Sequence, residues 1–111
     1  MTANTLADSK TVLLVDDDSS TVNLYSRRLE EAGFRTASAF DAEQPEAIPD
    51  VSADLIILNL MAPKRSGLEL LQTIRSNSLH KNTPVLLLSN AYLPDLAQKG
   101  LNAGGNKALP V

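Results

Sequence analysis

Three short runs made only of apolar residues constrain the fold of this chain more than any other feature. They occupy residues 12–15, 55–58 and 85–88, and each is followed at once by a polar residue. A run of this length between turn signals is typical of a strand that meets water on neither face. Such strands belong to parallel sheets with helices on both sides, so we predict an α/β fold.

The segment after the first run has a helical pattern. Its apolar residues recur at helical spacing: Val22, Tyr25, Leu29 and Ala32. We expect Ser19 or Ser20 to cap the start of this helix. Gly33 fits the left-handed position that ends a helix, with Phe34 then folding back onto Leu29.

Two later segments also carry helix signals. Ser66 and Glu69 form an S-x-x-E capping box ahead of an apolar stretch. Pro94 fits the first turn of a further helix, which we expect to end near Gly100 or Gly104.

The remaining elements are shorter. Residues 34–38 alternate between apolar and polar and predict a strand near the sheet edge, and residues 106–109 predict a final short strand. Two prolines leave residues 41–49 little more than one helical turn. The resulting order is β-α-β-α-β-α-β-α-β.

The length of 111 residues predicts one domain over residues 11–111, preceded by a disordered or extended segment over residues 1–10. A doubly wound sheet would normally carry a fifth helix after its last strand, and we expect this helix to be absent. Either the chain is cut short or a partner covers that surface.

The charge balance argues against several classes of protein. Ten Lys and Arg stand against thirteen Asp and Glu, and no basic cluster indicates direct binding to nucleic acid. The apolar runs are too short to cross a membrane, the N-terminal residues do not resemble a secretory signal, and there is no cysteine. We therefore expect a cytoplasmic protein without thiol chemistry.

Three adjacent carboxylates follow the first strand: Asp16, Asp17 and Asp18. Ligands bind at the carboxyl ends of strands in open α/β sheets. One of the three, Asp18, is placed to do no more than cap the next helix, but capping needs only one carboxylate. Clustered hard oxygen ligands suit Mg²⁺ or Ca²⁺, so we predict a divalent-cation site, present or ancestral.

The other strand ends make this pattern specific. Asn59 closes the third strand and opens a loop containing Pro63 and Gly67, and Ser89 closes the fourth strand. Together with residues 15–18, these motifs make the chain resemble the response-regulator receiver family from about Lys10 to its end. The resemblance implies a doubly wound five-stranded parallel sheet of flavodoxin-like order 2-1-3-4-5. It also implies a role in two-component phosphorelay signalling, with Ser89 at the switch position.

The chain departs from that family at the positions that carry out and report phosphorylation. Asn59 stands where the family has the phosphoacceptor aspartate, and a carboxamide cannot form a stable acyl phosphate. Val111 falls at the position of the family's lysine, or Leu109 does if Pro110 is matched to the family's proline. Ala108 falls at the position of its aromatic switch. Lys107 is the nearest cation, but strand alternation need not aim it at the pocket.

These departures predict a non-enzymatic pseudo-receiver that signals without phosphorylation. We expect weak Mg²⁺ binding through Asp17, the backbone carbonyl of Met61 and Asn59, with Asp16 acting through water. The expected partner is a histidine kinase, an effector domain or a second copy. It would dock on the last two strands and the helix between them.

Two alternative functions and one alternative role remain open. In the first alternative the chain is an ordinary receiver with an engineered aspartate-to-asparagine change. In the second it is a phosphatase resembling haloacid dehalogenases, with Asp16 as nucleophile and Asp18 as general acid/base. Ser89 has the simpler interpretation of a helix cap. His80 lies in a polar loop before Lys81 and is expected to be a solvated residue of that loop.

Overall fold

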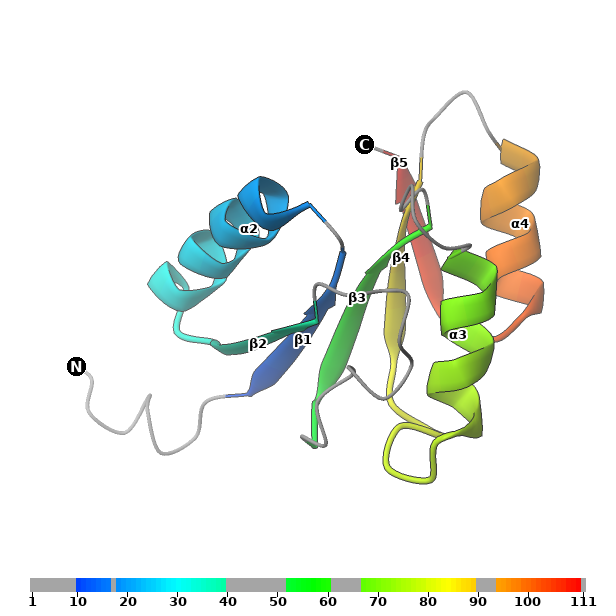
Figure 1. Ribbon diagram of the computed structural model, residues 1–111, viewed down its shortest axis with the longest axis horizontal. Helices are drawn as coiled ribbons and strands as arrows, with labels where there is room; N and C mark the ends of the chain where they lie inside the picture. Colours follow the sequence, from blue (N-terminus) through cyan, green and yellow to red (C-terminus); the bar gives the residue numbers. More distant parts are fainter. Residues whose placement is uncertain (1–9, 17, 40–51, 61–66, 90–93, 111) are drawn as a thin grey trace.

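A computed structural model of the chain describes residues 10–16, 18–39, 52–60, 67–89 and 94–110 (Figure 1). The strands within these ranges are β1 (Thr11–Val15), β2 (Arg35–Ala39), β3 (Leu55–Asn59), β4 (Val85–Ser89) and β5 (Lys107–Pro110). The helices are α2 (Ser19–Glu31), α3 (Gly67–Ser76) and α4 (Pro94–Asn102). The strands form one parallel sheet in the order β2-β1-β3-β4-β5, which confirms the predicted fold and the edge position of β2.

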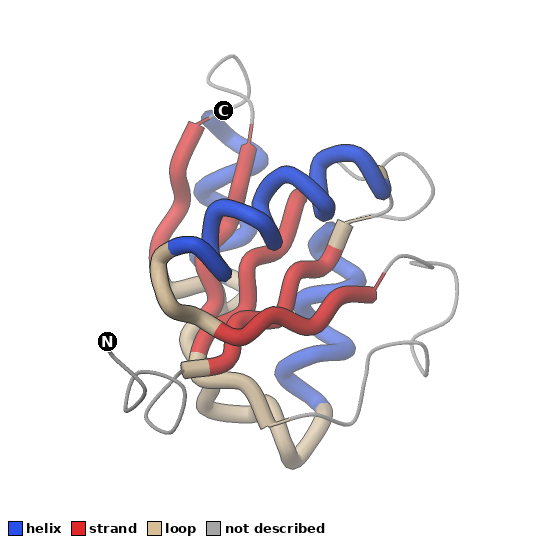
Figure 2. Tube along the Cα trace, turned by 90° about the vertical axis from the view of Figure 1, so that its left-hand side faces the viewer, coloured by secondary structure: helices blue, strands red, loops and turns tan. Residues whose placement is uncertain are grey.

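The helices lie on both sides of the sheet, α2 on one face and α3 with α4 on the other (Figures 1 and 2). Successive residues of a strand point to opposite faces, so the apolar runs feed two cores. The larger core, on the α3 and α4 side, contains Leu13, Val15, Ile56, Leu58, Val85, Leu87 and the α3 residues Leu70, Leu71 and Ile74. The smaller core contains Val12, Leu14 and Val22 under α2. The continuous apolar run of β1 therefore reflects burial on both faces.

The end of α2 follows the predicted pattern. Gly33 has a φ of 98°, and its N–H donates to the carbonyl of Glu30 at 3.0 Å. The N–H of Phe34 donates to the carbonyl of Leu29, also at 3.0 Å. These two bonds satisfy carbonyls that the helix would otherwise leave unpaired at its end.

The start of α2 corrects one prediction. Asp18, with extended backbone, is the N-cap, and its Oδ1 accepts the N–H of Ser20 at 3.1 Å. Ser19 and Ser20 lie inside the helix, so the expectation that one of them is the cap was wrong. The capping role considered for Asp18 is confirmed.

The later elements start close to where the sequence predicted them. Pro94 is the first residue of α4, which ends at Asn102, between the two glycines expected to stop it. The final strand begins at Lys107, one residue later than predicted. The Ser66 capping position and residues 41–49 lie outside the described residues.

The loop between α3 and β4 overturns the expectation for His80. Its side chain is fully buried, and neither ring nitrogen has a hydrogen-bond partner among the described residues. Arg75 holds this loop by donating to the backbone carbonyls of His80, Lys81 and Thr83. It also donates to the carbonyl of Gly104 and so ties the loop to the turn before β5. The mostly polar sequence of this loop does not reveal that it folds inward.

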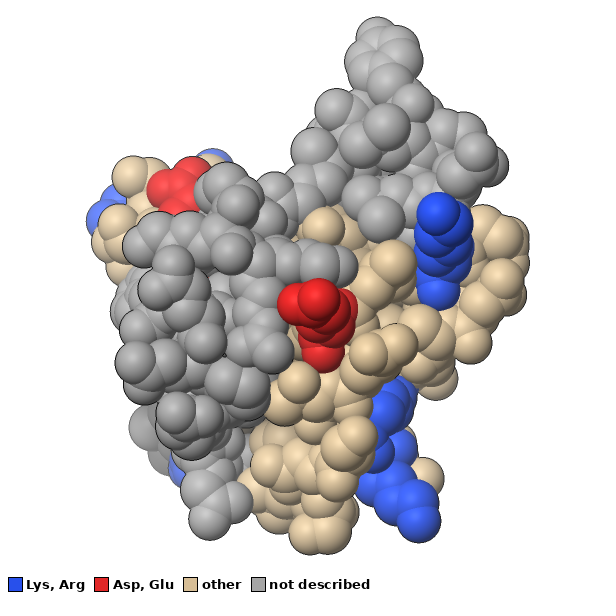
Figure 3. Space-filling model, turned by 45° about the vertical axis from the view of Figure 1, so that its right-hand side comes forward, with Lys and Arg blue, Asp and Glu red and all other residues tan. Residues whose placement is uncertain are grey.

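The surface and the helices add two observations. On the described part of the face in Figure 3, Lys and Arg are separated by uncharged surface and form no continuous basic patch. Among the described helices, none has the length and apolar character needed to cross a membrane.

Candidate functional site

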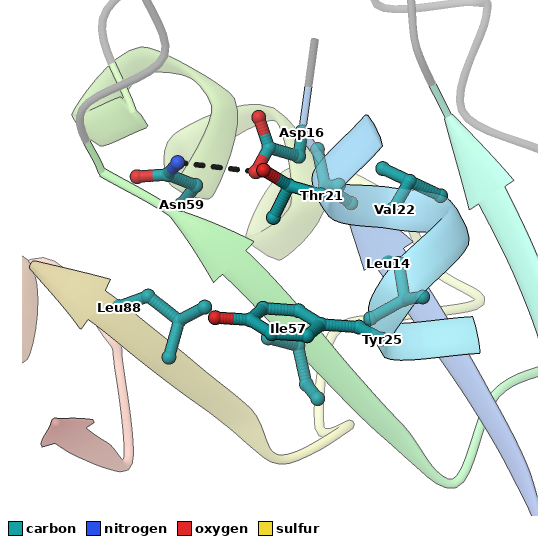
Figure 4. Close-up of a pocket in the computed structure, with 9 residues that line it drawn as sticks. Leu14, Asp16, Thr21, Val22, Tyr25, Ile57, Asn59 and Leu88 are labelled. Atoms are coloured by element: carbon teal, nitrogen blue, oxygen red, sulfur yellow. Dashed lines mark hydrogen bonds between the residues drawn. The ribbon is translucent and has the colours of Figure 1, made fainter. Parts of the chain in front are cut away.

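Two polar side chains meet where β1 and β3 end. These strands are parallel neighbours with Val15 paired to Leu58, so the residues that follow emerge at the same edge of the sheet. These residues are Asp16 and Asn59, which are 43 positions apart in sequence. The amide Nδ2 of Asn59 donates to Oδ2 of Asp16 at 3.1 Å (Figure 4).

Both oxygens of the Asp16 carboxylate are engaged. Oδ1 accepts the backbone N–H of Asp18 at 3.0 Å, while Oδ2 takes the hydrogen bond from Asn59. The side chain is only 7% exposed. A buried carboxylate is costly without hydrogen bonds, and here two neutral donors supply them.

Asp18 has a separate role. It is exposed, and its Oδ2 accepts the hydroxyl of Thr21 at 2.8 Å. The Thr21 hydroxyl, followed by the N–H of Ser20, lowers the pKa of Asp18. Its carboxylate therefore stays ionised to lower pH than an ordinary aspartate and serves the helix start.

A small hollow lies beneath the Asp16–Asn59 pair. Its apolar wall comes from Val22 and Tyr25 on α2 and from Ile57 and Leu88 on the sheet. The Tyr25 ring crosses Ile57 with its hydroxyl toward Leu88 (Figure 4). Sequence reasoning placed Tyr25 on the buried face of α2 but not beside the polar pair, because helical spacing does not say which strand a long side chain reaches.

Of the other residues expected at the site, the structure describes some and not others. Asp17, Met61 and Val111 lie outside the described residues. Ser89 is the last residue of β4 and pairs in register with Pro110.

The two informative positions of β5 are Ala108 and Lys107. Ala108 pairs with Leu87 and packs against the larger core. Lys107 pairs with Leu86, at the opposite end of β5 from the strand ends that carry Asp16 and Asn59. Since a strand advances about 3.3 Å per residue, Lys107 starts about 7 Å behind the row that contains Asn59 and Leu109.

Comparisons with known proteins agree with this architecture. The family model described as response regulator receiver domain matches residues 12–110. The transcriptional regulatory protein CpxR of Klebsiella pneumoniae is 35% identical over 99 residues, which are 89% of this chain and 41% of CpxR. The phosphate regulon transcriptional regulatory protein PhoB of Pseudomonas aeruginosa is 33% identical over 98 residues, which are 87% of this chain and 43% of PhoB. The chain thus spans about two fifths of the length of these relatives.

A solved structure shows the same fold. The chemotaxis protein CheY4 of Vibrio cholerae superposes with a TM-score of 0.81 at 29% identity, covering 92% of this chain and 86% of CheY4.

Proposed function

The chain belongs to the response regulator receiver family of two-component signalling, and we propose that it signals without phosphorylation at residue 59. The observation that carries the proposal is the Asn59 amide at the end of β3, bonded to Asp16. Capture of a phosphoryl group requires a carboxylate nucleophile at that strand end. The family's charge partner and aromatic switch also have no counterpart at Val111 and Ala108. We infer a degenerate, pseudo-receiver variant.

The Asn59–Asp16 bond supports this view through its electrostatics. A second carboxylate at residue 59 would repel Asp16 and call for a metal ion or a lysine to balance the charge. The amide replaces that repulsion with attraction. The negative charge of Asp16 is therefore stabilised by a neutral hydrogen-bond donor of the chain itself.

The site retains oxygen ligands suited to magnesium. Asp16 and Asn59 are hard donors, but Oδ2 of Asp16 already accepts the Asn59 hydrogen bond. A carboxylate has about four lone-pair positions, so Asp16 can still accept a hydrogen bond from a metal-bound water. We propose weak Mg²⁺ binding through Asp17, the carbonyl of Met61 and Asn59, with Asp16 acting through water. Isothermal titration at millimolar Mg²⁺ tests this, and the absence of heat would contradict it.

We propose that the domain, residues 11–111, is a cytoplasmic protein-interaction module and not an enzyme. Its partner would be a histidine kinase, an effector domain or a second copy, docking on α4, β4 and β5. CpxR and PhoB are transcriptional regulatory proteins. The net charge of −3 and the separated basic side chains speak against direct contact of this domain with nucleic acid.

The decisive experiment is incubation with acetyl phosphate and Mg²⁺, followed by intact mass spectrometry, with beryllofluoride binding read by NMR. We expect no phosphoryl adduct, and no change in the amide spectrum around Asn59 when beryllofluoride is added to the chain already in Mg²⁺. The Asn59→Asp variant is the matched control, because it restores the carboxylate and changes nothing else. A stable adduct on the unaltered chain would overturn the proposal.

Two alternative interpretations can be distinguished from this proposal by experiment. An engineered aspartate-to-asparagine change would give an Asn59→Asp variant that is phosphorylated at the rate of ordinary receivers. A phosphatase using Asp16 and Asp18 would turn over an aryl phosphate and lose that activity in Asp16→Ala. The lowered pKa of Asp18 argues against the second, since a general acid must hold a proton near the working pH.

A further inference from the structure

We propose that the loop between α3 and β4 is a proton-sensitive latch, which is closed while the His80 ring is neutral and opens when that ring takes up a proton. We call residues 77–84 the latch loop. It lies where β4 begins, at the opposite end of the sheet from Asp16 and Asn59 (Figure 1). The inference therefore does not depend on the chemistry of residue 59.

Arg75, near the end of α3, holds the latch loop closed. Its Nη1 donates to the backbone carbonyls of His80, Lys81 and Thr83. Its Nε and Nη2 donate to the carbonyl of Gly104 at 3.1 and 2.8 Å, which attaches the loop to the turn before β5. These acceptors are all neutral carbonyl oxygens, so they leave the positive charge of the guanidinium group unbalanced.

The side chain of His80 is enclosed when the latch loop is closed. It is fully buried, and neither ring nitrogen has a hydrogen-bond partner within the described part of the chain. A neutral imidazole leaves one donor and one acceptor unpaired there, which is a moderate cost. An imidazolium would place two unpaired donors and a full charge in the same space, which costs far more.

The charged groups around the latch loop do not offset that cost. Three elements border the loop besides α3: β3, whose Ile56 N–H donates to the carbonyl of Pro84, the turn before β5, whose Gly104 accepts from Arg75, and α4, which contacts α3. The described charged side chains on and next to these elements are Arg75 and Glu69 on α3, Lys81 in the loop, Lys99 on α4, Lys107 on β5 and Asp54 ahead of β3.

Neither of the two carboxylates in this set is paired with His80. Glu69 is in the first turn of α3, at the far end of that helix from the latch loop. Asp54 is exposed, and its Oδ2 accepts the N–H of Thr11 on β1 at 2.8 Å. The remaining charged groups are cations, and the closed loop therefore has no described group that would stabilise an imidazolium.

A proton should consequently shift the latch loop toward an open form. Opening exposes the ring to water, which supplies the hydrogen-bond acceptors and the solvation that the closed loop lacks. Because the open form binds one proton more strongly, the equilibrium constant for opening can rise by up to about tenfold for each unit by which the pH falls. Opening separates Arg75 Nη1 from the loop carbonyls and leaves the sheet intact, so it is local and not global unfolding.

Hydrogen exchange of the full chain, followed by NMR, tests the latch. Protection factors, which correct for the pH dependence of intrinsic exchange, are compared between about pH 8 and about pH 5. The amides of His80 and Thr83, which bond within the loop, should lose up to about tenfold of their protection per pH unit, while Leu14 in β1 keeps its protection. The chain has one histidine, so its ring signals can be followed directly and should titrate over the same range.

Two variants separate the proton sensor from the clamp. His80→Leu removes the titratable ring and should make the protection of the loop independent of pH, which also excludes the N-terminal amino group as the sensor. Arg75→Lys should lower the protection of the loop at every pH and retain its pH dependence, because it weakens the clamp and leaves the sensor in place.

The unaltered chain can by itself refute the latch. Undiminished protection of His80 and Thr83 at about pH 5 would overturn the proposal, and so would a ring that titrates inside a loop that stays protected. An equal loss of protection in His80→Leu would show that another group is the sensor. Full protection in Arg75→Lys would show that the guanidinium group is not what holds the loop closed.

Discussion

Replacing Asn59 by aspartate should destabilise the protein at neutral pH, although the change restores the residue that the family uses. Asn59 Nδ2 lies 3.1 Å from Asp16 Oδ2, so the substitution exchanges a donor for a second negative charge at that distance. With an effective dielectric constant of about 20, two unit charges this close repel by about 5 kcal/mol. Rotation of the side chains to about twice the separation would halve this value.

The expected loss combines that repulsion with the lost hydrogen bond. The hydrogen bond to a carboxylate contributes about 1.5 kcal/mol, so Asn59→Asp should lower the free energy of unfolding by about 4 kcal/mol at low salt. Asn59→Ala is the matched control. It removes the hydrogen bond without adding a charge and should cost about 1.5 kcal/mol.

Urea titrations of both variants over a range of pH provide the measurement. In Asn59→Asp, the crowded pair keeps a proton in the folded state that the unfolded chain has already released. Stability therefore falls as the pH rises, and the two variants should converge in acid. Magnesium should stabilise Asn59→Asp more than Asn59→Ala. At a Mg²⁺ concentration ten times the dissociation constant, the free energy of unfolding of Asn59→Asp should rise by about 1.4 kcal/mol. Equal stability of the two variants at neutral pH without metal would refute the reasoning.

Three other residues lead to further expectations. His80→Leu should raise the free energy of unfolding by about 1 kcal/mol in urea titration, because a buried ring without hydrogen bonds carries a desolvation cost; a lower midpoint would contradict this. Arg75→Lys should cost about 2 kcal/mol in thermal unfolding, since one ammonium group cannot span the carbonyls of both loops; an unchanged midpoint would count against it. Asp18→Ala should lower the melting temperature at neutral pH, while Asp18→Ser retains most of the cap. The pKa of Asp18 is lowered in the folded state, so its contribution to stability is present at neutral pH and is lost as the pH falls through the folded-state pKa. If the melting temperatures of Asp18→Ala and the unaltered chain differed by the same amount at every pH down to acid, the capping role of the Asp18 carboxylate would be contradicted.

Local patterns were enough to predict the elements that the structure describes and the order in which these follow one another. The apolar runs at 12–15, 55–58 and 85–88 became β1, β3 and β4, because burial on both faces leaves no position for a polar residue. Gly33 ended α2 because its left-handed conformation is a property of one residue and its immediate neighbours. The motifs at the strand ends were likewise sufficient to indicate the family.

Contacts between distant segments were decided only by the tertiary structure. The bond from Asn59 to Asp16 joins residues 43 positions apart, and its direction depends on how two strand ends are packed. His80 is buried in a loop whose carbonyls, with that of Gly104, accept hydrogen bonds from Arg75, and no periodicity encodes these contacts. Strand alternation identifies which residues share a face, but not whether a helix covers that face. The exposure of Leu109 could therefore be seen only in the tertiary structure.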